Sequence, residues 1–158
     1  MRRFTPIELA IGVALLGSVA AVAVPTFIRE VHASRFSEPL DGLGRMSQNA
    51  VAYAEAHQRF PDSAPLTPAT PPRGTKEADP PGTWDVPEWK ALDFQPAAEG
   101  APHAYSFAFD SQGTTFVARA RGDLDGDGIL STFEVRGSIP PGEQPRVEPG
   151  MYVEAELE

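Results

Sequence analysis

Acidic side chains alternate with other residues in one short segment near the C-terminal end of the chain. The segment reads DLDGDGILSTFE over residues 123–134. Calcium takes six to eight oxygen ligands, and carboxylates at every second position of a tight turn can point toward a common centre. The expected ligands are three aspartates, a backbone carbonyl, a hydroxyl and a final bidentate glutamate: Asp123, Asp125, Asp127, Ile129, Ser131 and Glu134. The segment therefore predicts a structural Ca²⁺ site.

The spacing matches the twelve-residue loop of an EF-hand, with Gly128 at the position that requires a positive φ. The preceding residues, 115–121, alternate like a strand, so we expect a strand–loop–strand turn and not a helix pair. The alternative is a metal-free hairpin turn, because Asp and Gly both favour turns. Against this alternative, four carboxylates that converge without a cation would repel one another.

The N-terminal region carries a carboxylate at the edge of an apolar run. Residues 9–28 contain no charged side chain, with Glu8 before them and two arginines at positions 2 and 3. A helix of about 20 residues covers ~30 Å, the thickness of a bilayer core. Basic residues before such a span keep the N-terminus in the cytoplasm. A carboxylate at this position is costly unless it has a partner, which makes Glu8 a candidate functional residue.

The string FTPIEL at residues 4–9, followed by the apolar run and Pro25, resembles the class III signal of type IV pilins and type II secretion pseudopilins. The resemblance implies that residues 1–3 are a leader removed between Arg3 and Phe4. Phe4 would become the methylated first residue, and Glu8 would occupy the fifth position, where the family has its Glu. Pro25 falls where the helix of the family usually kinks. The chain departs from the family in having Arg3 in place of Gly and Pro6 in place of Leu.

This resemblance implies a structural subunit of a pilus or pseudopilus. The unusual Arg3, together with a helix weakened by Gly42 and Gly44, favours a minor or specialised subunit. Its partners would be other pilin or pseudopilin subunits, a prepilin peptidase and the inner-membrane assembly machinery. The subunit would wait in the bacterial inner membrane, with its C-terminal head in the periplasm, before it enters the fibre. The resemblance also implies that Glu8 pairs with the α-amino group of a neighbouring Phe4, in which case Glu8→Ala would leave the protein in the membrane and outside the fibre.

Other interpretations of the N-terminal region remain open. One alternative is a plain membrane anchor. The other is a secretory signal cleaved after Ala23, where the sequence Ala-Val-Ala fits the small-x-small rule. Either would suit an alternative function, a membrane-anchored or secreted calcium-binding domain that does not polymerise.

Composition excludes several other classes of protein. The net charge of −9 argues against a nucleic-acid binder, because contacts to the phosphate backbone need a basic surface. The absence of cysteine excludes disulfides and thiol chemistry. Neither a Ser/His/Asp or Cys/His arrangement nor a glycine-rich phosphate loop is evident. We therefore do not expect an enzyme.

The expected fold is α+β, with a long N-terminal helix packed on a small antiparallel sheet, as in pilins. Residues 4–28 would form the membrane and assembly half of the helix and residues 29–60 an amphipathic half. The apolar stripe of the second half is Phe36, Leu40, Leu43, Met46, Ala50 and Tyr53. Pro39, Gly42 and Gly44 predict a bend or local melting within it.

Residues 61–158 would form a loop-rich head. Residues 61–103 are rich in proline, and we expect a wrapping loop that is anchored by Trp84 and Trp89, with a short helix at 88–94. Alternating apolar residues then predict a hairpin of strands at 105–109 and 116–120. Further strands are expected at 130–136 and 151–157.

Overall fold

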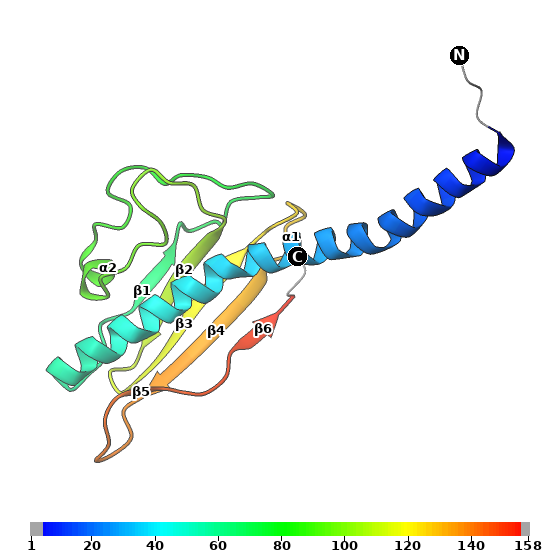
Figure 1. Ribbon diagram of the computed structural model, residues 1–158. Coiled ribbons are helices and arrows are strands. Elements are labelled where there is room, and N and C mark those ends of the chain that lie inside the picture. The colour runs from blue at the N-terminus through cyan, green and yellow to red at the C-terminus, as the bar shows by residue number, and fades with distance from the viewer. Residues whose placement is uncertain (1–4, 156–158) are drawn as a thin grey trace. The chain divides into compact units, whose positions relative to one another are not determined.

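The structure is a computed structural model that describes residues 5–155, without the side chains of residues 28–35. The chain divides into two compact units, with the boundary between Phe36 and Ser37. Helix α1 (Pro6–His57) begins in the first unit and ends in the second (Figure 1). The fold is α+β, as expected: an N-terminal apolar helix and a small antiparallel sheet.

The first unit exposes apolar side chains all along its described part. The segment Pro6–Phe27 is long and apolar enough to cross a membrane. Its large apolar side chains, from Ile7 to Phe27, are between 54% and 72% exposed. Within the described residues of this unit, the helix therefore has no apolar partner.

The second unit contains a six-stranded sheet in which all neighbouring strands are antiparallel. Its central strands are long and regular, and its edges are short (Figure 1). In spatial order the strands are β1 (Ala64–Thr67), β2 (Tyr105–Ser111), β3 (Thr115–Gly122), β4 (Ser131–Ser138) and β5 (Arg146–Val147). The last strand, β6 (Tyr152–Glu154), also pairs with β4, opposite residues 132–134.

The second part of α1 lies across one face of this sheet (Figure 1). The buried side chains of the two surfaces are apolar on both sides: Leu43, Met46, Ala50 and Ala54 on the helix, and Tyr105, Phe107, Phe109, Phe116, Ala118, Ala120, Phe133 and Val135 on the strands. The alternation predicted for β2 and β3 is confirmed, because these strand residues share the face that the helix covers.

Three glycines of the second unit lie beside aromatic rings, with no room for a side chain. A Cβ atom at Gly42 would lie 2.5 Å from the ring of Phe107, and one at Gly122 would lie 2.8 Å from the ring of Tyr105. A Cβ at Gly137 would overlap the ring of its strand neighbour Phe116. Gly42 thus has a packing function in the helix, because it lets the helix approach the sheet closely.

The structure corrects the expectation of local melting in α1. The helix continues without interruption through Pro39, Gly42 and Gly44. Packing on the sheet outweighs the low helix propensity of these residues, because most helix stability in proteins comes from a buried face. The buried stripe also differs from the predicted one, since Leu40 is 47% exposed and Ala54 is buried. The helix ends at His57, and Gln58 then takes a positive φ of 58°.

Several boundaries in the head also differ from the expectation. The long segment 61–103 contains the unpredicted strand β1, and the short helix α2 covers Pro87–Ala91. Strand β5 was not predicted. Strand β6 covers residues 152–154 of the predicted strand 151–157, of which residues 156 and 157 lie outside the described residues. Trp89 is fully buried, as expected of a core anchor.

Candidate functional site

The loop between β3 and β4 brings the three predicted aspartates together. One carboxylate oxygen from each of Asp123, Asp125 and Asp127 lies within 4.8 Å of the others. Asp123 is almost fully buried, at 1% exposure, whereas the other two aspartates are exposed. Glycines 126 and 128 make the turn possible with φ values of 84° and 96°. This part of the predicted site is therefore assembled.

The three carboxylates also hold the loop in shape by accepting backbone N–H groups. Asp123 accepts from Gly126 at Oδ1 (2.8 Å) and from Gly128 at Oδ2 (3.2 Å). Asp125 Oδ1 accepts from the N–H of Asp127 at 3.0 Å, and Asp127 Oδ1 accepts from that of Ile129 at 2.7 Å. Side chains of this type commonly stabilise turns in this way. The loop thus has an internal hydrogen-bond network made by its own carboxylates and backbone N–H groups.

The structure places two further predicted ligands away from the cluster. Ser131 is buried, and its hydroxyl donates to the carbonyl of Gly122 at 3.1 Å. Glu134 accepts from Arg119 Nε at 3.0 Å, and Arg119 also pairs with Asp110. In an EF-hand a helix follows the loop and returns the twelfth residue to the ion. Here β4 begins at Ser131, so the strand carries Glu134 away along the face of the sheet.

The sixth predicted ligand, Ile129, was expected to offer its backbone carbonyl. The structure places Ile129 at the end of the loop, with its side chain 53% exposed. Its backbone N–H is engaged by Asp127, as described above.

Sequence reasoning missed one residue of this site. Arg73 Nε lies 3.4 Å from Asp123 Oδ2, so a guanidinium faces the most buried carboxylate of the cluster. Residue 73 also forms a parallel backbone bridge with residue 123, and the N–H of Gly74 donates to the carbonyl of Asp123 at 2.8 Å. No local pattern could indicate this contact, because the two residues are far apart in the sequence.

A second candidate site surrounds Glu8 at the start of α1. Thr5 donates to Glu8 Oε2 from its N–H (2.7 Å) and from its hydroxyl (3.0 Å). In return, the N–H of Glu8 donates to the Thr5 hydroxyl at 3.3 Å. This reciprocal pattern is a capping box, which satisfies free N–H groups at a helix start. The sequence signal for this capping box is Thr-x-x-Glu at residues 5–8, and it gives Glu8 a local partner at the start of the helix.

The remaining residues of the predicted N-terminal site are only partly within the described chain. Arg3 and Phe4, the predicted processing residues, lie outside the described residues. Pro25 lies within α1, is exposed, and does not interrupt the helix.

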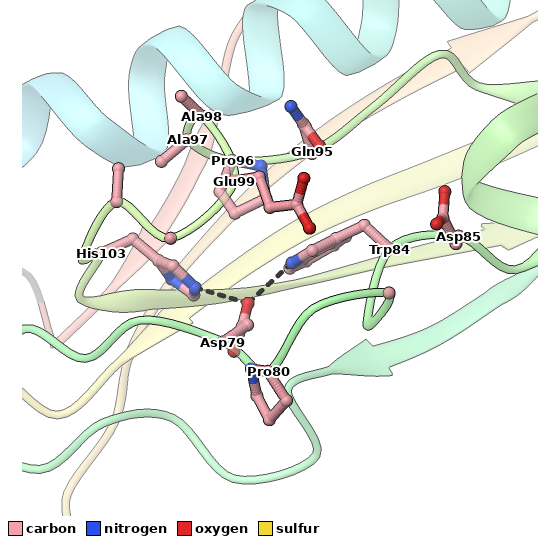
Figure 2. Close-up of a pocket in the computed structure, with 13 residues that line it drawn as sticks. Asp79, Pro80, Trp84, Asp85, Gln95, Pro96, Ala97, Ala98, Glu99 and His103 are labelled. Atoms are coloured by element: carbon pink, nitrogen blue, oxygen red, sulfur yellow. Dashed lines mark hydrogen bonds and ion pairs between the residues drawn. The ribbon is translucent and has the colours of Figure 1, made fainter.

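A third arrangement of polar side chains fixes the long segment 61–103 (Figure 2). Asp79 Oδ2 accepts from Trp84 Nε1 at 2.6 Å and faces His103 Nε2 at 2.7 Å. His103 Nδ1 lies 2.8 Å from the carbonyl of Tyr105, which can only accept, so Nδ1 carries a hydrogen. Asp79, Trp84 and His103 line a cavity of about 80 Å³. Because the polar groups bond to one another, we interpret them as a structural clasp.

Comparisons with protein-family models, with curated proteins and with solved structures found no match to this chain.

Proposed function

We propose that the protein is a pilin-type structural subunit of a type IV pilus or a type II secretion pseudopilus, and a minor or specialised one. One observation carries the proposal. Helix α1 combines an exposed apolar segment, whose only charged residue is Glu8, with a segment that forms the core of a small head.

The exposed apolar segment supports the proposal because it needs a partner that the described chain does not supply. Apolar surface of this extent is covered by lipid or by other protein surfaces. Before assembly the segment would cross the inner membrane once, with the head in the periplasm. In a fibre the same surface would pack on copies of itself or on related subunits. Gly12 and Gly17 have open space around them, and small residues permit close approach of helices.

Glu8 supports the proposal because its capping box uses only one of the two carboxylate oxygens, Oε2. Both bonds from Thr5 go to Oε2, and no hydrogen bond to Oε1 is found among the described residues. This second oxygen can accept from the α-amino group of a neighbouring Phe4 after a prepilin peptidase has removed residues 1–3. A buried pair of this kind adds little net stability, but it fixes the register between helices.

Three variants separate this pairing from the capping function of Glu8. Glu8→Gln keeps a side chain that can cap the helix but removes the charge, whereas Thr5→Ala removes the cap and keeps the charge. Glu8→Ala removes both. We expect both Glu8 variants to remain in the membrane and to be lost from sheared fibres, as measured by immunoblotting of the two fractions. Thr5→Ala should enter the fibre.

Two outcomes would contradict this assignment. One is normal incorporation of Glu8→Gln into fibres. The other is an intact mass of the native protein that excludes a methylated chain starting at Phe4, because the pairing requires a free amino group at that residue. A chain that begins at Val24 would instead indicate a secreted domain.

The convergence of Asp123, Asp125 and Asp127 favours a second candidate function, a non-polymerising anchored or secreted domain that binds calcium. Calcium bound only by the folded state would stabilise it by about 2.7 kcal/mol at a hundredfold excess over Kd. We therefore expect a higher melting temperature in calcium than in excess chelator. Equal melting temperatures would exclude a stabilising calcium site, with magnesium as the control cation.

A further inference from the structure

The aspartate loop already has a positively charged group beside it. The guanidinium of Arg73 lies against Asp123, which is the first ligand of the predicted calcium loop. A Cβ atom built on Gly128 would lie 3.1 Å from Arg73 Nη2, so the guanidinium reaches over the glycine of the turn. Arg73 thus occupies the neighbourhood in which a bound cation would lie.

Backbone contacts hold Arg73 at this position. The parallel bridge between residues 73 and 123 and the bond from the N–H of Gly74 align the segment with the loop. The backbones of Gly74 and Gly126 also pack closely, because a Cβ on either glycine would lie 3.5 Å or less from the backbone at the other. These backbone contacts therefore fix the position of Arg73 beside Asp123, although the Arg73 side chain itself is exposed.

The lone-pair sites of the Asp123 carboxylate limit how a second cation could bind beside Arg73. A carboxylate has about four lone-pair sites. The N–H of Gly126 uses one site on Oδ1, and the N–H of Gly128 uses one site on Oδ2. Arg73 faces Oδ2 as an ion-pair partner at 3.4 Å, so the second site on Oδ1 is the one that lies away from this contact. A divalent ion bound to Asp123 would lie close to the guanidinium, and the two positive charges would repel each other.

We propose that Arg73 is the resident counter-charge of the aspartate loop and that it competes with divalent cations for Asp123. The guanidinium offsets the repulsion among the three carboxylates when no metal is present, and it lowers their affinity for Ca²⁺. The competition rests on the calcium-binding loop of the second candidate function and is independent of the pilin-type proposal.

Calcium titration of the full-length protein in detergent tests the competition. Arg73→Gln removes the charge, and Arg136→Gln is the matched control, because Arg136 is exposed and pairs with Val117, far from the loop along β3 and β4. Removing a charge about 5 Å from a divalent ion changes its affinity by about tenfold or more, even at the dielectric constant of water. We expect Arg73→Gln to bind Ca²⁺ at least about tenfold more tightly than the unaltered protein or Arg136→Gln. Circular dichroism in chelator checks that each variant is folded.

Arg73→Lys keeps the test decisive if Arg73→Gln does not fold. Lysine retains the positive charge but lacks the planar fork of arginine. The calcium affinity of the Arg73→Lys variant should therefore stay within a few-fold of that of the unaltered protein. A gain of tenfold or more with lysine would overturn the competition, because the charge would then not be its cause.

The outcomes distinguish this proposal from the calcium function itself. If only Arg73→Gln binds calcium, the calcium function of the native protein fails and the role of Arg73 stands. If the native protein and Arg73→Gln bind with equal affinity, the calcium function stands and the role of Arg73 is overturned. If neither binds, both are overturned.

Discussion

The two halves of helix α1 have similar backbones and opposite surroundings. In residues 6–27 the large apolar side chains are all exposed, and the glycines have open space beside them. In residues 37–57 an apolar stripe is buried on the sheet, and Gly42 lies directly against Phe107. Both halves contain proline and glycine, yet both are helical throughout.

The difference shows where the stability of each half originates. The second half is held by the core that it helps to form, so residues that disfavour helix are tolerated there. The first half has no such partner among the described residues, although its composition is the more apolar. In the proposed function, lipid or other helices would supply the missing contacts.

The largest expected effect comes from removing the aromatic ring that joins helix and sheet. Phe107 is fully buried, beside Gly42 and with its ring centroid 5.1 Å from that of Phe94. Phe107→Ala should lower the free energy of unfolding by about 3–5 kcal/mol. Both tryptophans lie in the second unit, so urea unfolding followed by their fluorescence measures that unit.

Phe27→Ala is the matched control in the first half of the helix. Phe27 is 67% exposed, so its truncation should leave the unfolding midpoint of the head unchanged. Equal losses in the two variants would show that the first half also contributes to the core of the head, and the contrast between the halves would then be wrong.

The strands and the acidic loop were predictable because their signals are local. The alternation of Tyr105, Phe107 and Phe109 is visible in the sequence and corresponds to the buried face of β2. The spacing of the aspartates likewise predicts a turn in which their carboxylates converge. Patterns of this kind depend on neighbours within a few residues, and the structure preserves them.

The contacts that could not be predicted join distant parts of the chain. Arg73 reaches Asp123 across many residues, and nothing near either residue indicates the pair. Glu134 fitted the twelfth position of the loop, but its direction depends on the strand that follows, which pairs with β3 and places it beside Arg119. The low helix propensity of Gly42 predicts a weak point in the helix. The contact that compensates for it cannot be read locally, because the ring that packs against Gly42 comes from β2.

A smaller effect on the stability of the head is expected when the glycines of α1 are replaced by alanine, and its sign should differ between neighbouring positions of the helix. A Cβ at Gly42 would lie 2.5 and 2.6 Å from two carbons of Phe107, whereas Gly44 has no atom within 4 Å of the same position. Gly42→Ala should therefore destabilise the head by about 1–3 kcal/mol, because the core must shift to make room. Gly44→Ala should stabilise it by up to about 1 kcal/mol, because alanine has the higher helix propensity.

The same substitution in the first half completes the series. Gly17→Ala should leave the unfolding midpoint of the head unchanged, because no described atom lies within 4 Å of a Cβ at Gly17. If Gly42→Ala and Gly44→Ala gave equal stabilities, the close approach of Phe107 to the helix would be incorrect. Opposite signs at positions 42 and 44, with no change at position 17, would show that glycine has a packing function only where the sheet meets the helix. The glycines of the first half would then have no packing function within the head, and in the proposed fibre they would permit close approach of neighbouring helices.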